Sequence, residues 1–304
     1  MAPAATEFKV DDRAELSKRT IPLMVLGNAD SLPPAASSNL TVEPALAAQQ
    51  RFNVKGNAIV TGGLGTLGLA CSRALLQHGL RGLMVFDLDV GQVQHELIAL
   101  RGEFPDARIE ARSIDVTDDG SVAAGVAEAA SVFGSVEHLL CFAGVVGCVH
   151  ALDMPASQWR RILDINTTGS FICAQAVARQ MVSQGTGGSI TFVASISGHR
   201  VNFPQPQAAY NVSKAALLTL KSCLAAEWAR YGIRTNSVSP GYMDTILNEG
   251  DGLAHVRQVW AERNPSGRMG SPSELTGAVV LLTSDAGTYI NGSDIVVDGG
   301  GIVF

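Results

Sequence analysis

The fold of this chain is decided by one stretch of its sequence, Ala58-Ile59-Val60-Thr61-Gly62-Gly63-Leu64-Gly65-Thr66-Leu67-Gly68. Its aliphatic residues predict a buried strand, and the apolar spacing over 69–78 predicts a helix directly after the glycines. Glycines between a strand and a helix permit a tight turn and a close backbone approach, so the helix N-terminus can hold a pyrophosphate. Glycine spacing alone is weak evidence, because the chain has 32 glycines and many glycine turns bind no nucleotide. The neighbouring segments therefore decide whether this loop is a nucleotide site.

Strand and helix patterns alternate along the chain from residue 52 onward. Short aliphatic runs predict seven strands, at 57–61, 83–87, 108–115, 138–143, 189–195, 234–239 and 294–298. Helical spacing of apolar residues separates them, at 69–78, 90–101, 121–133, 159–183, 208–231 and 273–283. This alternation predicts an α/β fold, in which a single Rossmann domain over 52–304 has a doubly wound, seven-stranded parallel sheet with helices on both faces.

Residues 1–51 lack this pattern and are predicted to form a largely irregular N-terminal extension. No helical or strand period is sustained there, and the segment contains several prolines, Pro22, Pro33, Pro34 and Pro44. The apolar stretch at 21–26 follows Lys18 and Arg19, but it is too short and too proline-interrupted for a signal peptide. Acidic residues before it are untypical of a transit peptide, so we expect a cytoplasmic protein.

Composition and charge exclude several classes of function. The chain has 304 residues, of which 46% are hydrophobic and 16% charged, so it can bury a large core. Its 22 basic and 28 acidic residues give a net charge of −6, which disfavours a nucleic-acid or anionic-membrane partner. No apolar run approaches the roughly 18 residues that span a bilayer. Five cysteines without paired C-x-x-C spacing indicate neither a disulfide framework nor a metal site.

An acidic residue ends the second predicted strand where the dinucleotide fingerprint requires one. Asp87 lies about 20 residues beyond Gly68, where a carboxylate can accept hydrogen bonds from both adenosine ribose hydroxyls. Asp89 follows it, and no arginine comes directly after to bind a 2′-phosphate. These residues favour NAD(H) over NADP(H), although an acid that only caps the strand end is the alternative. Asp115, at the end of the third strand, could bond the adenine or cap the next helix.

The strongest chemical signal is Tyr210-Asn211-Val212-Ser213-Lys214, which lies on a helical pattern. A spacing of four residues places the phenol and the ammonium on one helix face. A tyrosine with its ordinary pKa of about 10 needs a depression of roughly three units, about 4 kcal/mol, to act as acid and base near neutrality. A lysine about 4 to 6 Å away supplies about that much at an effective dielectric constant of about 20. Isolated pairs of this spacing are usually solvated, so the context is again decisive.

Ser195 supplies that context at the end of the fifth predicted strand. A hydroxyl at the carboxyl end of a strand lies at the ligand crevice of a doubly wound sheet. In their order and spacing, the glycine-rich loop, Asp87, Ser195, Tyr210 and Lys214 resemble the short-chain dehydrogenase/reductase family over residues 52–304. The resemblance is highly specific, because these elements occur in the right order and at nearly the right spacing.

The resemblance implies a role for each residue of the site. Tyr210 would be the general acid and base, and Lys214 would lower its pKa and hold the nicotinamide ribose. Ser195 would polarise the carbonyl, and Asn166 would anchor a water molecule of the proton relay. The resemblance also implies a homotetramer. Taken with the nucleotide fingerprint, it predicts the following contacts with NAD(H): Gly62, Leu64, Gly65, Thr66, Leu67, Gly68, Asp87, Leu88, Asp115, Val116, Ala143, Gly144, Tyr210, Lys214, Pro240, Gly241, Met243 and Thr245.

Three departures from the family pattern concern the site. Thr66 stands where the usual loop has its second glycine, and Gly65 lies one position earlier. The usual Asn-Asn-Ala-Gly after the fourth strand reads Cys-Phe-Ala-Gly over 141–144, which puts its hydrogen bonds to the neighbouring strand in doubt. Ser195 lies two residues farther from the tyrosine than usual. Ser197 has the usual spacing, but Ser195 fits the strand-end position better.

The segment 195–207 resembles that of fungal mannitol dehydrogenases, sorbose reductases, and L-xylulose and hexulose reductases, as does 291–300. Many of those relatives use NADPH, so Asp87 is a further difference. The resemblance implies a small-molecule substrate, a ketose or a polyol. Polar side chains of the site would bond it, namely Ser195, Ser197, His199, Asn202, Gln205 and Tyr210.

We therefore expect an NAD(H)-dependent interconversion of a ketose and a polyol, such as L-xylulose and xylitol, a hexulose and a hexitol, or fructose and mannitol. A reductase of another carbonyl class, such as a cyclic ketone, a secondary metabolite or an acyl thioester, is the alternative. A third possibility is a nucleotide-binding regulator without catalysis. The complete set of Asn166, Ser195, Tyr210 and Lys214 argues against the regulator.

Overall fold

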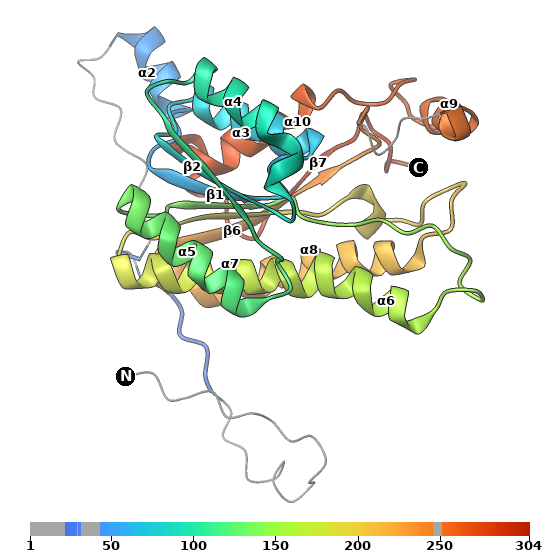
Figure 1. The fold of residues 1–304 in the computed structure, drawn as a ribbon, viewed down its shortest axis with the longest axis horizontal. Helices are drawn as coiled ribbons and strands as arrows, with labels where there is room; N and C mark the ends of the chain where they lie inside the picture. The colour runs from blue at the N-terminus through green and yellow to red at the C-terminus, as the bar shows by residue number, and fades with distance from the viewer. Residues whose placement is uncertain (1–21, 29, 32–42, 246–250) are drawn as a thin grey trace, which may run out of the picture.

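The computed structural model describes residues 22–28, 30–31, 43–245 and 251–304. Seven parallel strands form one sheet in the order β3-β2-β1-β4-β5-β6-β7 (Figure 1). Their bounds are β1 Asn57–Thr61, β2 Gly82–Asp87, β3 Arg108–Ser113, β4 His138–Cys141, β5 Gly188–Val193, β6 Ile233–Pro240 and β7 Asp294–Val297. The predicted doubly wound α/β fold is confirmed, and each strand ends within two residues of its predicted bounds.

Helices cover both faces of the sheet, as Figure 1 shows. One face carries α3 Thr66–Gln77, α4 Gln94–Glu103 and α10 Ser273–Thr283, and the other carries α5 Asp119–Phe133, α7 Gly169–Gln184 and α8 Ala208–Trp228. Each face has its own hydrophobic core. In β1, Val60 packs into one core and Ile59 into the other, and both are completely buried. Because successive side chains of a strand point to opposite faces, a strand covered on both sides needs an unbroken apolar run.

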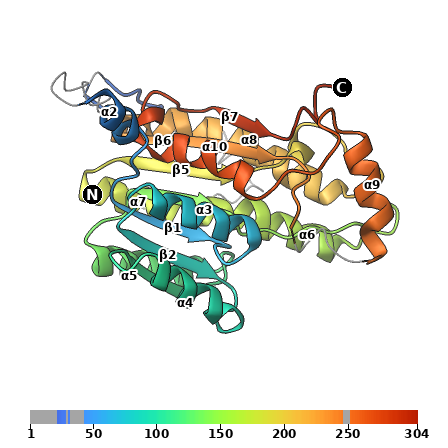
Figure 2. The same cartoon turned by 90° about the horizontal axis from the view of Figure 1, so that it is seen from above.

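Some helical segments differ from the prediction. The helix expected at 159–183 is divided into α6 Ala156–Leu163, a π-helical turn at Asp164–Thr168, and α7. Neither α2 Pro44–Arg51 nor α9 Ala254–Glu262 was predicted, and they lie at opposite ends of the molecule (Figure 2). α2 buries none of its residues, so its sequence has no apolar stripe that could have revealed it. Short 3-10 turns lie at Val90–Val93, Ile196–Gly198, Ala229–Tyr231, Asp251–Leu253 and Asp285–Gly287.

Only part of the predicted N-terminal extension is described. Residues 1–21, 29 and 32–42 lie outside the described residues. The segment 22–28 is exposed and has no regular secondary structure. The helix α2 is the departure from the predicted irregular extension.

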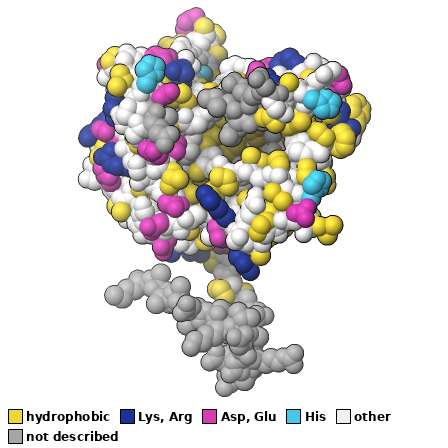
Figure 3. Space-filling model, turned by 45° about the vertical axis from the view of Figure 1, so that its right-hand side comes forward, with side chains coloured by type: hydrophobic (Ala, Val, Ile, Leu, Met, Phe, Trp, Pro, Cys, Tyr) yellow, Lys and Arg dark blue, Asp and Glu magenta, His cyan; other side chains and the backbone are white. Residues whose placement is uncertain are grey.

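The strand order reverses between β1 and β4. After β1 the chain builds β2 and β3 on one side, and it then returns to place β4 on the other side of β1. The ends of these two strands pair through Thr61 and Cys141, so the loops that follow diverge from one point. Ligands of open α/β sheets bind in the crevice at such a point. Figure 3 shows this side of the molecule hollowed near its centre, with hydrophobic side chains in the hollow.

Three further observations bear on function. None of the described helices combines the length and the apolar character needed to cross a lipid bilayer. The described side chains form no group of three or more His, Cys, Asp or Glu residues placed to hold a metal ion. All five cysteines are free thiols.

Candidate active site

The glycines of the loop after β1 differ in the space around them. A side chain at Gly62 would meet the backbone nitrogen of Ala143 at 2.6 Å, and its φ of +61° is one that L-residues rarely adopt. A side chain at Gly68 would collide with the carbonyl oxygen of Gly62. At Gly65, nothing lies nearer than that same oxygen, at 3.4 Å. The chain itself therefore requires Gly62 and Gly68, whereas Gly65 leaves the loop open to a ligand.

The first turn of α3 presents backbone N–H groups that no capping side chain accepts. Its N-cap is Gly65, and the turn contains no acidic residue. A helix N-terminus has unpaired amides and a positive partial charge, so it stabilises an anion. These features fit the pyrophosphate of a dinucleotide, and the predicted contacts Thr66 and Leu67 lie in this turn.

The Asp87 carboxylate lies at the end of β2 against the same loop. Its Oδ2 accepts a hydrogen bond from the backbone N–H of Leu64 at 3.2 Å, and its Oδ1 accepts one from that of Leu88 at 2.9 Å. Each oxygen keeps a lone pair for a ribose hydroxyl. Asp115 Oδ1 instead accepts hydrogen bonds from the backbone N–H and the hydroxyl of Thr117. These two hydrogen bonds lower the pKa of the Asp115 carboxyl. Asp115 thus stabilises the turn before α5, and its contact with adenine stays a prediction.

The segment after β4 is held by β1, although it lacks the two asparagines. The backbone N–H of Phe142 donates to the carbonyl of Thr61 at 2.9 Å, and that of Ala143 donates to Thr61 Oγ1 at 3.2 Å. The threonine that ends β1 therefore supplies the hydrogen bonds that the sequence put in doubt. A side chain at Gly144 would lie 3.6 Å from Lys214 Nζ, so the glycine keeps the space beside the lysine open.

Asn166 lies in the π-helical turn between α6 and α7 and is completely buried. Its Oδ1 accepts a hydrogen bond from the backbone N–H of Val145 at 2.8 Å. Its Nδ2 donates to the carbonyl of Val145 and to Ser213 Oγ, both at 2.9 Å. The amide therefore ties the segment after β4 to α8. Because both amide protons are used, a relay water here would have to donate to an oxygen of Asn166.

Tyr210 and Lys214 lie one turn apart on α8, and Ser195 follows the end of β5. Lys214 Nζ lies 5.6 Å from the centre of the Tyr210 ring and donates a hydrogen bond to the carbonyl of Val193 at 2.7 Å. The hydroxyl of Ser195 lies near enough to the Tyr210 phenol to lower the pKa of that phenol, and it donates a hydrogen bond to Ser197 Oγ at 3.1 Å. The structure thus brings Ser195 to the tyrosine, as its strand-end position predicted.

Burial governs the protonation of the tyrosine and the lysine. Desolvation raises the pKa of the Tyr210 phenol to about 12, and the neighbouring Ser195 hydroxyl offsets only part of that rise. Desolvation also lowers the pKa of the Lys214 ammonium to about 8. The predicted depression of the tyrosine pKa is therefore wrong for the chain by itself. Burying a phenolate costs more free energy than its neighbours return.

The segment between β5 and α8 is held in place by Asn211. Its Nδ2 donates to the carbonyl of Ser197 at 2.7 Å, to the carbonyl of Arg200 at 2.9 Å and to Asn202 Oδ1 at 3.0 Å. Asn211 is the neighbour of Tyr210 on α8. The same helix turn therefore positions both the phenol and the polar segment beside it.

Two residues predicted to bind substrate converge on Tyr242. Asn202 Nδ2 donates to the Tyr242 hydroxyl at 2.7 Å, and Gln205 Nε2 donates to it at 3.1 Å. The Tyr242 ring stacks on Trp260, with ring centroids 4.2 Å apart and planes inclined by 8°. Trp260 Nε1 in turn donates to Gln205 Oε1 at 3.1 Å. These four side chains form one hydrogen-bonded wall of the site.

His199 does not join this wall. Its Nε2 lies 3.0 Å from Asp294 Oδ2 and 3.1 Å from Ser239 Oγ, where β7 begins and β6 ends. Ser197 is also bonded within the protein, because its Oγ accepts a hydrogen bond from Gln207 Nε2 at 3.2 Å. Contacts of His199 and Ser197 with substrate stay predictions.

Four of the predicted NAD(H) contacts lie in the loop that begins where β6 ends, namely Pro240, Gly241, Met243 and Thr245. A side chain at Gly241 would meet the Cβ of Asp298 at 2.7 Å, so the glycine allows the loop to pass close to the segment after β7. Met243 and Thr245 are 3% and 7% exposed. The loop is therefore packed against the domain, and the contact of Thr245 with NAD(H) stays a prediction.

Known proteins share this architecture and this sequence pattern. A family model described as enoyl-(acyl carrier protein) reductase matches residues 63–301. The crystal structure of a short-chain type dehydrogenase/reductase from Mycobacterium marinum aligns with a TM-score of 0.80 at 37% sequence identity, covering 84% of this chain and 99% of that one. This chain belongs to the short-chain dehydrogenase/reductase family.

Polyol dehydrogenases are among the relatives of this short-chain dehydrogenase/reductase. Galactitol 2-dehydrogenase from Rhizobium johnstonii is 38% identical over 255 residues, which cover 83% of this chain and 97% of that protein. A probable NADP-dependent mannitol dehydrogenase from Yarrowia lipolytica is 35% identical over 255 residues, which cover 83% of this chain and 89% of that protein. The predicted resemblance to this branch of the family is confirmed.

Three residues of the candidate site were not predicted from the sequence of this short-chain dehydrogenase/reductase. Asn211 stands directly beside Tyr210, and its amide would have been a signal for a residue that holds the neighbouring segment. Tyr242 directly follows Pro240 and Gly241 at the end of β6, and this position at a strand end could have marked it as a candidate site residue. Trp260 gave no signal, because only the packing of α9 brings it to Tyr242.

Proposed function

We propose that this short-chain dehydrogenase/reductase interconverts a ketose and a polyol, with NAD(H) as the hydride carrier and Tyr210 as general acid and base. The observation that carries the proposal is the position of the Ser195 hydroxyl beside the Tyr210 phenol, with Lys214 one helical turn away on α8. The names of the relatives, galactitol 2-dehydrogenase and NADP-dependent mannitol dehydrogenase, support the substrate class. The side-chain amides of Asn202 and Gln205, which donate to the Tyr242 hydroxyl, also support this substrate class. Hydroxyl-rich substrates need many hydrogen-bonding partners.

In the reductive direction, the residues around Tyr210 would stabilise and protonate the carbonyl oxygen. Ser195 would donate a hydrogen bond to that oxygen, and Tyr210 would transfer its proton as the oxygen becomes an alkoxide. A bound nicotinamide cofactor supplies the hydride. A phenol with a pKa of about 12 stays protonated at neutral pH, which suits a proton donor. The Lys214 ammonium, 5.6 Å from the ring centre, would stabilise the phenolate that remains.

The preference for NAD(H) within this proposal is argued from Asp87. Its carboxylate is held against the glycine loop by hydrogen bonds from Leu64 and Leu88, so it cannot easily turn away from the ribose. A 2′-phosphate there would bring close to two negative charges against the carboxylate. The name of the Yarrowia relative specifies NADP, so this preference would distinguish the present chain from that protein.

The experiment that tests the proposed function compares carbonyl classes. We would measure NADH-dependent reduction of L-xylulose, D-fructose and L-sorbose beside a cyclic ketone and an acyl thioester. The proposal expects at least one ketose to have the highest kcat/KM of the panel. A cyclic ketone or thioester that is reduced faster than every ketose would contradict the substrate class. Cofactor binding without turnover of any carbonyl would contradict the catalytic role.

A further inference from the structure

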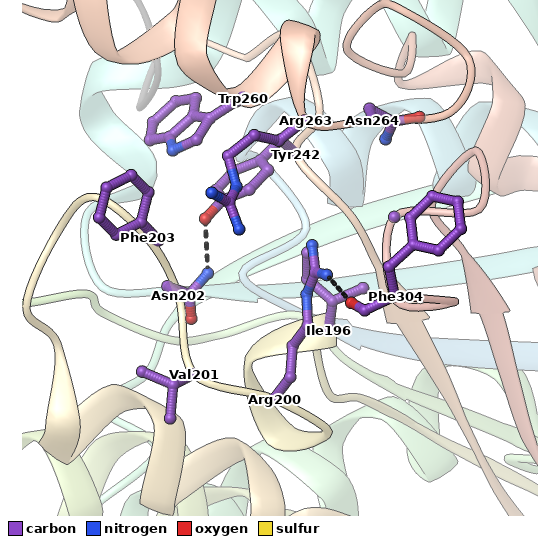
Figure 4. Close-up of a pocket in the computed structure, with 11 residues that line it drawn as sticks. Ile196, Arg200, Val201, Asn202, Phe203, Tyr242, Trp260, Arg263, Asn264 and Phe304 are labelled. Carbon is purple, nitrogen blue, oxygen red and sulfur yellow. Dashed lines mark hydrogen bonds between the residues drawn. The ribbon is translucent and has the colours of Figure 1, made fainter.

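A cavity of about 160 Å³ lies beside the proposed catalytic residues (Figure 4). Ile196, which directly follows Ser195, lines it, and so does Tyr242. The Tyr242 phenol lies near enough to Tyr210 to raise the pKa of that residue. A substrate whose carbonyl lies at Tyr210 would therefore bring its neighbouring carbon atoms close to Tyr242.

The amide of Gln205 can face Tyr242 in one orientation only. Its Oε1 accepts a hydrogen bond from Trp260 Nε1 at 3.1 Å, and an indole nitrogen is a donor that cannot accept. The other end of the same amide, Nε2, must then face the Tyr242 hydroxyl, which lies 3.1 Å away. Because an amino group donates, the Tyr242 oxygen accepts this hydrogen bond.

The amide of Asn202 is fixed in the same way by Asn211. Asn211 Nδ2 lies 2.7 Å from the carbonyl oxygen of Ser197 and 2.9 Å from that of Arg200, so it is a donor. Asn202 presents its Oδ1 to this donor at 3.0 Å, which turns its Nδ2 toward the Tyr242 hydroxyl at 2.7 Å. Figure 4 shows this last hydrogen bond. The Tyr242 oxygen therefore accepts a second hydrogen bond.

These two hydrogen bonds determine where the Tyr242 proton can go. A phenol oxygen accepts at most two hydrogen bonds and donates one, so neither amide can take the proton. Among the described residues, no other side chain or carbonyl is hydrogen-bonded to this hydroxyl. The ring is held by its stack on Trp260, which is buried, so the hydroxyl cannot easily move to another acceptor. The proton is therefore available to a group that enters the cavity.

We propose that Tyr242 donates its hydroxyl proton to a substrate hydroxyl close to the reacting carbonyl, and so determines specificity. A ketose has a hydroxyl on each carbon next to its carbonyl, whereas a simple ketone has only C–H groups there. A substrate without an oxygen at this place would displace solvent from Tyr242 and leave its donor unpaired. Sites built to bond a substrate hydroxyl reject the analogue that lacks it for this reason. The proposal rests on the proposed function for its carbonyl chemistry and narrows its substrate class to hydroxyketones.

The hydrogen bond from Tyr242 takes no part in the redox step. Tyr210 supplies the proton that the product keeps, and Tyr242 retains its own proton throughout. The bond is made with the bound substrate and persists as the carbonyl is reduced. Tyr242 is thus a specificity-determining residue, and removal of its hydroxyl should raise KM more than it lowers kcat.

The first test pairs one substitution in the protein with one deletion in the substrate. Tyr242→Phe keeps the ring and its stack but removes the proton. The substrates are L-xylulose, D-fructose and L-sorbose, each with its 1-deoxy, 3-deoxy and 4-deoxy analogues. We expect Tyr242→Phe to lower kcat/KM for the most active ketose by about threefold to tenfold, as for one neutral hydrogen bond, and to leave one of its deoxy analogues unchanged. That analogue identifies the hydroxyl that Tyr242 binds.

This comparison separates a direct contact from a damaged wall. Tyr242→Phe leaves the amides of Asn202 and Gln205 without their acceptor, and that damage would affect every substrate equally. A contact with one hydroxyl appears only in the ratio between a ketose and its deoxy analogue. Both values of that ratio come from one protein sample, so any loss of folded protein cancels. Tyr289→Phe, at an exposed position, is the matched control and should keep the wild-type ratios.

The second test measures binding without turnover. A ketose with NAD⁺ forms a complex of ketone and oxidised cofactor in which no hydride transfer can occur. We expect at least one of the three ketoses to raise the melting temperature of the wild-type protein with NAD⁺ more than one of its deoxy analogues does. In Tyr242→Phe, the same two sugars should raise the melting temperature equally.

The outcomes separate this proposal from the proposed function. An equal loss of kcat/KM for a ketose and all its deoxy analogues, or no loss for any, would overturn the role of Tyr242 and leave the ketose reductase intact. A preference in binding that Tyr242→Phe removes, without turnover of any sugar, would support the role of Tyr242 and overturn the catalytic proposal. Neither binding nor turnover of the three ketoses would overturn both.

Discussion

The Lys214 ammonium donates a hydrogen bond to the backbone carbonyl of Val193 at 2.7 Å, in a buried setting that lowers its pKa from 10.5 to about 8. Between these two values the unfolded chain binds a proton that the folded chain does not. The free energy of unfolding therefore rises with pH from about 8 to about 10.5. The rise amounts to about 3 kcal/mol, and this stabilisation is absent at neutral pH. The fold keeps a charge in its site at a cost in stability.

Lys214→Met should remove turnover and weaken cofactor binding, yet leave the cofactor-free protein about as stable as wild type at pH 7. Loss of the hydrogen bond to Val193 lowers the free energy of unfolding by about 1 to 3 kcal/mol. The variant no longer buries a charged group, and this gain offsets the loss. Urea unfolding at neutral and alkaline pH checks this, because wild type should gain stability relative to the variant as pH rises. Identical pH dependence of the two proteins would contradict the buried-charge interpretation. Lys221→Met, on the same helix, is the control that should keep activity.

Tyr210→Phe should lower kcat by about hundredfold or more while NADH binding survives, because only the proton donor is removed. Turnover with saturating NADH and fluorescence titration of NADH provide the two measurements. Tyr289→Phe is a matched control, since Tyr289 is 96% exposed. A variant that retained turnover within about tenfold of wild type would exclude Tyr210 as the general acid.

The pH dependence of the reduction rate should follow the pKa of Lys214 instead of the pKa of Tyr210. Tyr210 keeps its proton up to a pKa of about 12, whereas Lys214 loses its charge above about 8. At saturating NADH, kcat/KM for the ketose should be level near neutrality and fall as pH rises through the lysine pKa. A profile that stayed level well into the alkaline range would show that the lysine charge is not needed.

Asp87→Ser should narrow the preference for NADH over NADPH, chiefly by lowering KM for NADPH. A phosphate about 4 Å from the carboxylate would be repelled by about 2 kcal/mol after screening, which corresponds to roughly thirtyfold discrimination. The ratio of kcat/KM for the two cofactors measures it, with Asp106→Ser at an exposed position as control. If wild type already favoured NADPH, a basic residue such as Arg81 or Arg73 would have to reach the phosphate.

Asn166→Ala should destabilise the protein and reduce activity together. The substitution removes three hydrogen bonds, namely those of the Val145 N–H and carbonyl and the one that Ser213 Oγ accepts, at a cost of about 3 kcal/mol. Thermal unfolding and turnover of the same sample check both effects. Asn28→Ala, at an exposed position, should change neither. Wild-type stability of the Asn166 variant would mean that water replaces its amide.

The layers of the fold and the position of the glycine loop could be predicted from local sequence patterns. Strands covered on both faces require unbroken apolar runs, and β1 and its neighbours could be read from that local pattern. The glycine loop and the Tyr210–Lys214 pair could also be recognised from the sequence, because each depends on the spacing of residues close together in the chain. The family resemblance, carried by such local motifs, was confirmed by the comparisons.

Properties that depend on contacts between distant segments could not be predicted from local patterns. Burial sets the pKa values of Tyr210 and Lys214, and its effect has the opposite sign to the lysine–tyrosine attraction expected from their spacing. The tertiary structure also places the Ser195 hydroxyl beside the Tyr210 phenol and bonds it to Ser197. The stacking of Tyr242 on Trp260 arises because α9 packs against the segment after β5, and no local spacing records such a contact.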